Sequence, residues 1–155
     1  MSEAKANLTE RYHVEVLDPD EDDGTMPNTV QKLRDQVIGH KIVKAERGAA
    51  RYKSPYFGFE DRGAGLILTL DNGKRVILAE TNDCCAFTEL ESFFLNVENV
   101  DHVITGVGTT DGFTRWHIYA DFGDILSLDV DWSAGNPFYY GYGFDIAVIE
   151  DGDNA

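Results

Sequence analysis

The sequence predicts a mainly β domain of the α+β class, an antiparallel curled sheet or barrel-like sandwich of about seven or eight strands with one or two short helices. Three observations predict it: a DNG turn between two apolar, β-branched runs, a second hairpin pattern over residues 113–132, and alternating bulky and small residues over 138–149. A chain of 155 residues is long enough for one domain, which we place at 12–150.

The N-terminal part of the chain predicts a flexible end, a strand and an acidic loop. Residues 1–11 are polar and are expected to be flexible. Alternating valines indicate a short strand over residues 12–17, and a run of aspartates indicates a solvated loop over 18–24. This loop does not match a calcium-binding loop, because the twelfth position counted from Asp18 is Thr29 and not a glutamate.

A helix, a strand and a long loop are expected next. The helix is predicted over residues 29–39, capped by Asn28 or Thr29, because one side collects apolar residues at helical spacing: Val30, Leu33 and Val37. Residues 40–47 alternate in the manner of a strand. Residues 49–65 combine glycine, proline and aromatic residues without a clear period, which predicts a long loop.

The following segments predict two hairpins and a second helix. The DNG turn at residues 71–73 joins the strands of the first hairpin. A short helix is expected around residues 87–94, because apolar residues recur there at helical spacing beside two glutamates: Phe87, Leu90 and Phe94. A loop is predicted at 108–112, with strands over three further segments: 101–107, 113–120 and 124–132.

The hairpin over residues 113–132 allows a register to be predicted. Apolar residues occupy even positions on both strands, so opposed residues must have an even sum if these side chains share the buried face. A three-residue connection would place Ala120 opposite Asp124. Arg115 then lies opposite Asp129, and we predict an exposed cross-strand ion pair between these two side chains.

The stretch NPFYYGYGFDIAV, residues 136–148, is unusually aromatic. Bulky residues occupy the even positions from 138 onwards, and mostly small residues occupy the odd ones. We interpret this period of two as a strand whose aromatic side packs into the core. The rings then have a structural role rather than forming a cofactor site, and the central ones are Tyr140, Tyr142 and Phe144.

The net charge of −15 is unevenly distributed: residues 1–31 carry −6, residues 32–75 carry +5 and residues 76–155 carry −14. Because such a surface repels phosphate, direct nucleic-acid binding is not expected, and the charge indicates either solubility or attraction to a basic protein. No apolar run is long enough to span a membrane and no secretory signal is recognisable, so we expect a cytoplasmic protein without a membrane partner. Residues 151–155 form an acidic C-terminal tail.

The two cysteines, Cys84 and Cys85, are neighbours, which disfavours a disulfide between them and is consistent with reduced thiols. Asp83 and His117 could join them around a metal ion, but the CxxC spacing typical of such sites is absent. The aspartates of residues 121–131 are interpreted as a solvated acidic face. We therefore assign no catalytic residue, no metal and no cofactor.

Three motifs resemble a known family: ETNDCCAFTELESF, DHVITGVGTTDGFTRWHIYADFGDILSLDVDW and NPFYYGYGFDI. They are similar to an uncharacterised family of small proteins, a domain of unknown function, encoded by bacteriophages of mycobacteria and related actinobacteria. The resemblance covers about residues 38–149. It implies a small accessory phage gene expressed in the host cytoplasm, and proteins of that kind often act by binding a host protein.

The first hypothesis for function is a non-enzymatic accessory protein that binds a host protein through a charged and aromatic surface and modulates its activity. One alternative is an acidic DNA mimic that occupies a host DNA-binding protein, supported by eight acids and no lysine or arginine from Trp116 to Ala155. Another is an enzyme or metal-binding protein that uses the cysteines, His117 or the aspartate-rich hairpin. The oligomeric state is left open. We expect the interface in and beside the predicted long loop, at Arg51, Tyr52, Tyr56 and Phe57.

Overall fold

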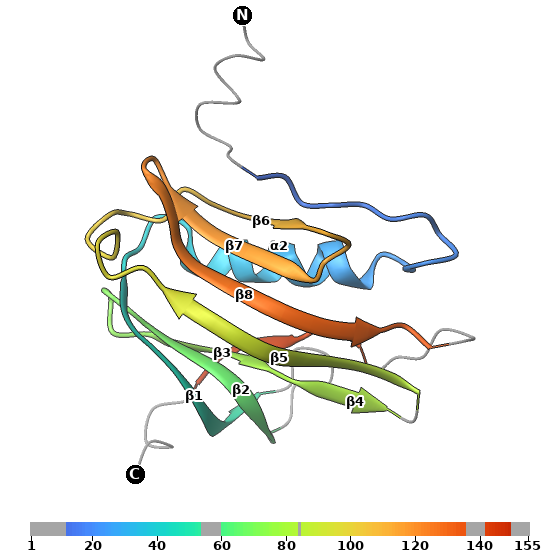
Figure 1. Ribbon diagram of the computed structural model, residues 1–155. Coiled ribbons are helices and arrows are strands. Elements are labelled where there is room, and N and C mark those ends of the chain that lie inside the picture. Colours follow the sequence, from blue (N-terminus) through green and yellow to red (C-terminus); the bar gives the residue numbers. More distant parts are fainter. Residues whose placement is uncertain (1–11, 54–59, 84, 136–141, 150–155) are drawn as a thin grey trace, which may run out of the picture.

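The computed structural model describes residues 12–53, 60–83, 85–135 and 142–149. In these residues nine strands form two antiparallel sheets, and one helix, α2 (Thr25–Val37), packs beside them (Figure 1). The first sheet has four strands, in the order β1 (Ile42–Lys53), β2 (Glu60–Leu70), β3 (Arg75–Ala79) and β9 (Asp145–Val148). The second has five, in the order β4 (Thr81–Asp83), β5 (Ala86–Leu95), β8 (Gly123–Ser133), β7 (Arg115–Ala120) and β6 (Gly106–Thr110).

The predicted antiparallel, mainly β class is confirmed, with more strands than expected and with no closed barrel among the described strands. The main core lies between the two sheets, where apolar residues of β2 and β3 face those of β7 and β8. Helix α2 closes one side of this core, because it contacts β6 and β9, the last strands of the two sheets. Its Arg34 donates a hydrogen bond from Nη1 to the carbonyl oxygen of Val107 in β6 (2.8 Å).

Helix α2 begins four residues earlier than the sequence predicted. Neither Asn28 nor Thr29 caps it, since the Thr29 hydroxyl donates to the Thr25 carbonyl inside the first turn (2.9 Å). The buried Asp22 instead accepts a hydrogen bond from the Met26 amide through Oδ1 (3.3 Å). The predicted apolar side of the helix is confirmed: Val30, Leu33 and Val37 are buried.

The prediction of a long loop over residues 49–65 is wrong for the part of this segment that the structure describes. Strand β1 continues to Lys53 and β2 already begins at Glu60, so the two strands form a long hairpin. Gly65 allows β2 and β3 to approach each other closely and does not form a turn. A Cβ on Gly65 would lie 2.0 Å from the Leu78 carbonyl oxygen. The sheet curls there around a second small core, which contains Ala50, Tyr52, Ile67, Ile77, Ala79 and Ile149.

The helix predicted around residues 87–94 is also wrong, because this segment is strand β5. A register shift between Leu90 and Ser92 adds one residue to the strand. Inward-facing side chains therefore sit at Leu90 and then at Phe93 and Leu95, which pack on the core, whereas Phe94 points outward. The residues of the predicted helical spacing therefore do not share a face, because Leu90 is buried and Phe94 is exposed.

The predicted pairing of Arg115 with Asp129 is confirmed, and the register holds as far as Ile118. It then shifts by one residue, so that Ala120 faces Gly123 and not Asp124. The cause is a shorter turn than predicted, which forces a bulge into the hairpin. Strand β6 covers Gly106–Thr110, so both the strand predicted over 101–107 and the loop predicted over 108–112 are largely wrong.

Residues 12–17 were predicted as a strand, but they form an extended segment outside the named strands. This N-terminal segment follows the edge of β6, where the Thr109 amide donates to the His13 carbonyl oxygen (2.9 Å). Near the C-terminus the predicted inward packing of Tyr142 and Phe144 is confirmed, although the strand itself begins only at Asp145. Tyr140, the predicted flexible N-terminus 1–11 and the acidic C-terminal tail 151–155 lie outside the described residues.

Candidate functional site

A cleft of about 380 Å³ opens between the acidic loop at residues 18–24 and the end of β8. Leu17, Asp20 and Glu21 line one side, and Trp132 lines the other together with the residues that follow it as far as Gly135. Gly112, from the turn between β6 and β7, completes the lining. We call this feature the Trp132 cleft. It combines an aromatic side chain with carboxylates that are exposed to solvent.

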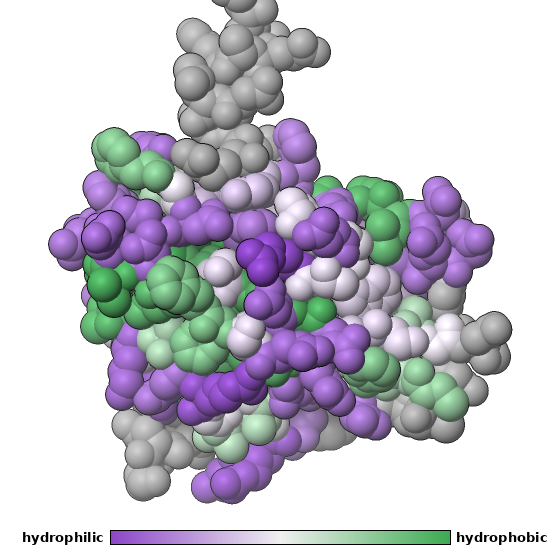
Figure 2. Space-filling model, viewed as in Figure 1, coloured by the Kyte–Doolittle hydropathy of each residue, from purple (hydrophilic) through white to green (hydrophobic). Residues whose placement is uncertain are grey.

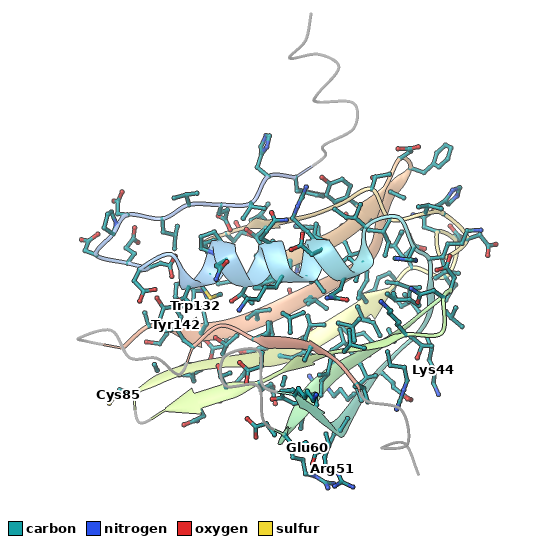
Figure 3. All side chains as sticks on the ribbon, turned by 180° about the vertical axis from the view of Figure 1, so that it is seen from behind. Lys44, Arg51, Glu60, Cys85, Trp132 and Tyr142 are labelled. Atoms are coloured by element: carbon teal, nitrogen blue, oxygen red, sulfur yellow. The ribbon has the colours of Figure 1, made fainter. Side chains whose placement is uncertain are left out.

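The Trp132 ring is held in place from two directions. Its Nε1–H donates a hydrogen bond to the Gly112 carbonyl oxygen (2.8 Å), which fixes the edge of the indole. Tyr142 stacks on the indole with ring centroids 5.9 Å apart and an interplanar angle of 16°, and Figure 3 shows the two residues close together. Phe113 meets it edge-on at 6.2 Å. The indole is therefore a rigid wall rather than a mobile side chain.

A hydroxyl–carboxylate cluster fixes the acidic loop against this wall. The Tyr142 hydroxyl lies 2.9 Å from Asp22 Oδ1 and 2.5 Å from Asp23 Oδ1, and it accepts a hydrogen bond from the Asp23 amide (3.1 Å). Burial and the hydrogen bond to Asp23 both raise the pKa of the Tyr142 hydroxyl. Burial also acts to raise the pKa of Asp23, but hydrogen bonds from Thr25 and Tyr142 outweigh it and lower this pKa. The predicted solvated loop is therefore anchored at Asp22 and Asp23.

The turn between β6 and β7 is fixed by Glu15 of the N-terminal segment. The Glu15 carboxylate accepts hydrogen bonds from the amides of Gly112 (3.0 Å) and Phe113 (2.7 Å). Asp111, Gly112 and Phe113 all have positive φ, a strained conformation for the two residues that are not glycine. The carboxylate stabilises this turn by accepting hydrogen bonds from two adjacent amides. The turn also holds the Trp132 indole, through the Gly112 carbonyl oxygen.

The charge at the cleft is concentrated in three exposed side chains. One carboxylate oxygen from each of Asp18, Asp20 and Glu21 lies within 4.8 Å of the others. Like charges at this separation repel one another, and a cation placed beside them relieves the repulsion. Oxygen ligands of this kind suit a hard cation such as Ca²⁺, but exposed acidic groups also occur without an ion. The arrangement is suited to binding positive charge.

Of the residues considered as metal ligands, Cys85 and His117 are the two whose side chains the structure describes, and they lie far apart. Ser127 of β8 pairs with His117 on one side and with Phe94, near the end of β5, on the other. The exposed Cys85 precedes the start of β5, so the strand separates it from His117 by roughly 25 Å. Cys84 and the side chain of Asp83 lie outside the described part of the chain.

His117 belongs instead to a buried cluster that sequence reasoning missed. Its Nε2 lies 3.0 Å from Thr110 Oγ1 and its Nδ1 lies 2.9 Å from Asp124 Oδ2. Tyr12 stacks on the imidazole with ring centroids 3.8 Å apart. The bulge after Ile118 is what brings Asp124 to this side of the hairpin. Because the ring is buried and covered by Tyr12, we interpret the cluster as an anchor for the N-terminal segment.

The aspartates of the β7–β8 hairpin are dispersed rather than paired with one another. Asp129 forms the predicted ion pair with Arg115, at 2.9 Å between Oδ1 and Nη2, and also accepts a hydrogen bond from Ser92 (2.8 Å). Asp124 is hydrogen-bonded to His117, and Asp131 is exposed. Two facing carboxylates, which an acid–base mechanism would use, are therefore not formed by these residues.

The predicted interface is corrected at one residue. Tyr52 is only 2 % exposed, because it packs into the second core and donates a hydrogen bond to Asp145 (3.3 Å). Arg51 is exposed on β1, far from Trp132 in Figure 3. Tyr56 and Phe57 lie outside the described residues.

Fold and cleft define the class as a small two-sheet antiparallel β domain with an acidic, tryptophan-lined cleft. Residues 35–146 match a domain of unknown function, DUF7448, and the chain belongs to this family. No curated protein and no solved structure matches the chain. The predicted membership of an uncharacterised family is thereby confirmed, and a phage origin stays a prediction. None of the helices that the structure describes is long and apolar enough to cross a membrane.

Proposed function

We propose that this chain is a non-enzymatic domain that binds a basic segment of another protein, and that a lysine or arginine of this segment enters the Trp132 cleft. The observation that carries the proposal is that the fixed Trp132 indole and the exposed carboxylates of Asp20 and Glu21 line one cleft. The resemblance to phage proteins makes a protein of the host cell the proposed partner, whose activity the binding would modulate.

The chemistry of the cleft favours a cation with an apolar stem. A guanidinium or ammonium group over an indole gains about 0.5–1 kcal/mol at an exposed site. Each exposed carboxylate that pairs with it adds about 0.2–1 kcal/mol. Leu17 and Ala134 offer apolar contacts to the methylene groups of a lysine or arginine side chain.

The charge of the whole chain supports the same partner. Residues 76–155 carry a net charge of −14, and the residues 1–31 that supply the acidic loop carry −6. This field attracts a basic segment and speeds its association at low ionic strength. The DNA-mimic alternative has less support, because Asp124 and Asp129 are already engaged by His117 and Arg115 and do not form a row of free charges.

A model ligand tests the cleft directly. Nα-acetyl-arginine amide, titrated against isotope-labelled protein, should shift the NMR signal of the Trp132 indole N–H with an affinity on the order of 1–10 mM. Nα-acetyl-citrulline amide has nearly the same shape without the charge and should leave the signal in place. Equal shifts with both compounds would refute recognition of a cation.

A variant in which two acids of the Trp132 cleft are neutralised tests whether their charges bind the ligand. The double change Asp20→Asn and Glu21→Gln should weaken arginine amide binding by roughly 3- to 10-fold, because it removes two charge–charge contacts. Glu98→Gln with Asp101→Asn removes the same charge in the connection between β5 and β6 and is the matched control. An equal loss in both variants would show that only net charge matters.

A further inference from the structure

A second surface, at the other end of the five-stranded sheet, exposes large apolar side chains. Phe94 is 67 % exposed on β5, and Phe122 is 73 % exposed at the turn between β7 and β8. Val97 and Val103 are also exposed, in the connection between β5 and β6. We call these four residues the apolar end. Figure 2 shows hydrophobic atoms in two groups at this end of the molecule, with hydrophilic atoms between them.

The fold does not need these side chains, because their neighbours already fill the core. Phe93 and Leu95 pack inward beside Phe94, and Ile104 is buried next to Val103. Large apolar side chains that are exposed without being needed by the core can mark an interaction site.

The backbone under the apolar end is fixed. The Asn96 amide donates to the Ile125 carbonyl oxygen (2.8 Å), and Asn99 donates from Nδ2 to the Asp124 carbonyl oxygen (3.0 Å). The His102 ring lies 4.7 Å from the ring of Phe122. A partner would therefore meet these side chains already positioned, with little backbone entropy left to lose.

The charges around the apolar end indicate what covers it. Glu98, Asp101 and Asp121 are exposed in the same two connections. Neither connection contains a lysine or arginine, and the nearby base is Lys41, which follows His40, whose carbonyl oxygen accepts the Ile104 amide (2.8 Å). A second copy of the chain would bring the same acids against these, which disfavours self-association. An apolar segment flanked by lysines or arginines satisfies both the side chains and the charges.

We infer that the apolar end is a docking surface for an amphipathic, basic segment of a partner protein. It is distinct from the Trp132 cleft, because strand β8, roughly 30 Å long, separates Phe122 from Trp132. The chain therefore has two binding surfaces, one for a basic side chain and one for the apolar side of a basic segment, and can hold two segments at once.

The test uses a fluorescent amphipathic helical peptide of leucine and lysine, with its anisotropy measured at constant ionic strength. It should bind the wild-type protein and lose roughly 10-fold or more in affinity when Phe94→Ser and Phe122→Ser are combined. Both side chains are exposed, so the double variant is expected to fold. Val16→Ser removes an apolar side chain that is 81 % exposed elsewhere and should leave the affinity unchanged.

Two control peptides and one measurement of mass complete the test. A serine and lysine peptide that binds equally well would overturn the apolar part of the proposal, and a leucine and glutamate peptide that binds equally well would overturn its charge part. The double change Asp20→Asn and Glu21→Gln separates the two surfaces: a smaller loss of affinity for the leucine and lysine peptide than in the double phenylalanine variant supports the apolar end, and an equal or larger loss would assign that peptide to the Trp132 cleft. A dimer that forms with concentration and disappears in the double phenylalanine variant would show that a second copy is the occupant.

Discussion

Tyr142 connects the aromatic and acidic sides of the Trp132 cleft through a single hydroxyl. That hydroxyl contacts the carboxylates of Asp22 and Asp23 and accepts the Asp23 amide, while the ring stacks on Trp132. Asp22 is only 4 % exposed and also receives the amides of Gly24 and Met26, at the start of helix α2. One atom therefore links the cleft to the beginning of the helix.

Replacing Tyr142 by phenylalanine tests this link. We expect Tyr142→Phe to lower the free energy of unfolding by about 1–3 kcal/mol, because the buried Asp22 loses a hydrogen-bond donor while the stacked ring stays. Urea denaturation measures the change. Tyr119→Phe is the control, since it removes one hydroxyl that donates to the Tyr12 carbonyl oxygen (3.2 Å), and its cost should be smaller. The opposite order would contradict the proposed role of Tyr142.

Asp145 carries a pH dependence of known sign. Burial raises the pKa of its carboxyl above the ordinary value of 3.8, although a hydrogen bond from Tyr52 acts to lower it. A carboxyl with a raised pKa stabilises the fold most at pH values below its ordinary pKa, and this contribution is lost as the pH rises through the folded-state pKa. At neutral pH the charged form is held in a partly buried position that disfavours it.

Asp145→Asn should therefore make the protein more stable than wild type at about pH 7, and this advantage should shrink as the pH approaches 4. The asparagine oxygen can still accept the hydrogen bond from Tyr52. Urea denaturation at several pH values gives the difference directly. An advantage that grows on acidification would mean that burial does not dominate at Asp145.

At the scale of elements, the alternation of apolar and polar residues predicted strand register correctly in regular stretches. It failed where a strand contains one extra residue. The pairing of Arg115 with Asp129 followed from alternation in β7 and β8. The position of Asp124 did not, because it depends on turn length and the resulting bulge. A register shift also follows Leu90 in β5, where apolar residues on both sides of the strand, Leu90 inward and Phe94 outward, gave an apparent helical spacing. Single-residue bulges leave no signal in a pattern of apolar residues, so these elements could not be predicted.

The glycines of β1 and β2 indicated a loop in the sequence, but they lie in strands. Glycine is needed there because of a close contact across the curled sheet. Gly48 and Gly65 face each other in the same ladder, which makes them a matched pair. A Cβ on Gly65 would meet the backbone of Leu78 at 2.0 Å, whereas one on Gly48 would meet only the flexible end of Ile67 at 3.0 Å. The two positions therefore differ in what has to move.

Gly65→Ala should destabilise the protein by about 1–3 kcal/mol or more, because backbone atoms of β3 must shift. Gly48→Ala should cost less, since the Ile67 side chain can change rotamer and alanine is favoured over glycine in a strand. Thermal or urea unfolding of both variants checks the order. Equal losses would mean that loss of glycine flexibility, and not the contact with Leu78, sets the cost.

At the scale of the whole molecule, the candidate site joins segments that are far apart in sequence. The sequence indicated the acidic loop at 18–24 and the end of the strand at 124–132, but nothing in either pattern places Asp20 beside Trp132. That they line one cleft depends on the Tyr142 hydroxyl and the Glu15 carboxylate, and both act over about a hundred residues of chain. The family match at 35–146 includes Trp132 but begins after the acidic loop.

The acidic loop should weaken the fold that carries it. A chain with a net charge of −15 repels itself, and the carboxylates of Asp18, Asp20 and Glu21 lie within 4.8 Å of one another. We expect the triple change Asp18→Asn, Asp20→Asn and Glu21→Gln to raise the melting temperature at low ionic strength. The gain should disappear in about 1 M salt, where charges are screened beyond about 3 Å.

The same triple variant should bind arginine amide more weakly than wild type, although it is more stable. Asp22 and Asp23 stay unchanged, so the start of helix α2 and the bonds to Tyr142 are kept. A gain in stability with a loss of binding indicates that these charges serve recognition and not folding. Thermal unfolding at low and high salt and the NMR titration give both quantities on one sample. A triple variant that melts lower than wild type at low salt would show that the three carboxylates stabilise the loop, and the charge-based account of the cleft would be wrong.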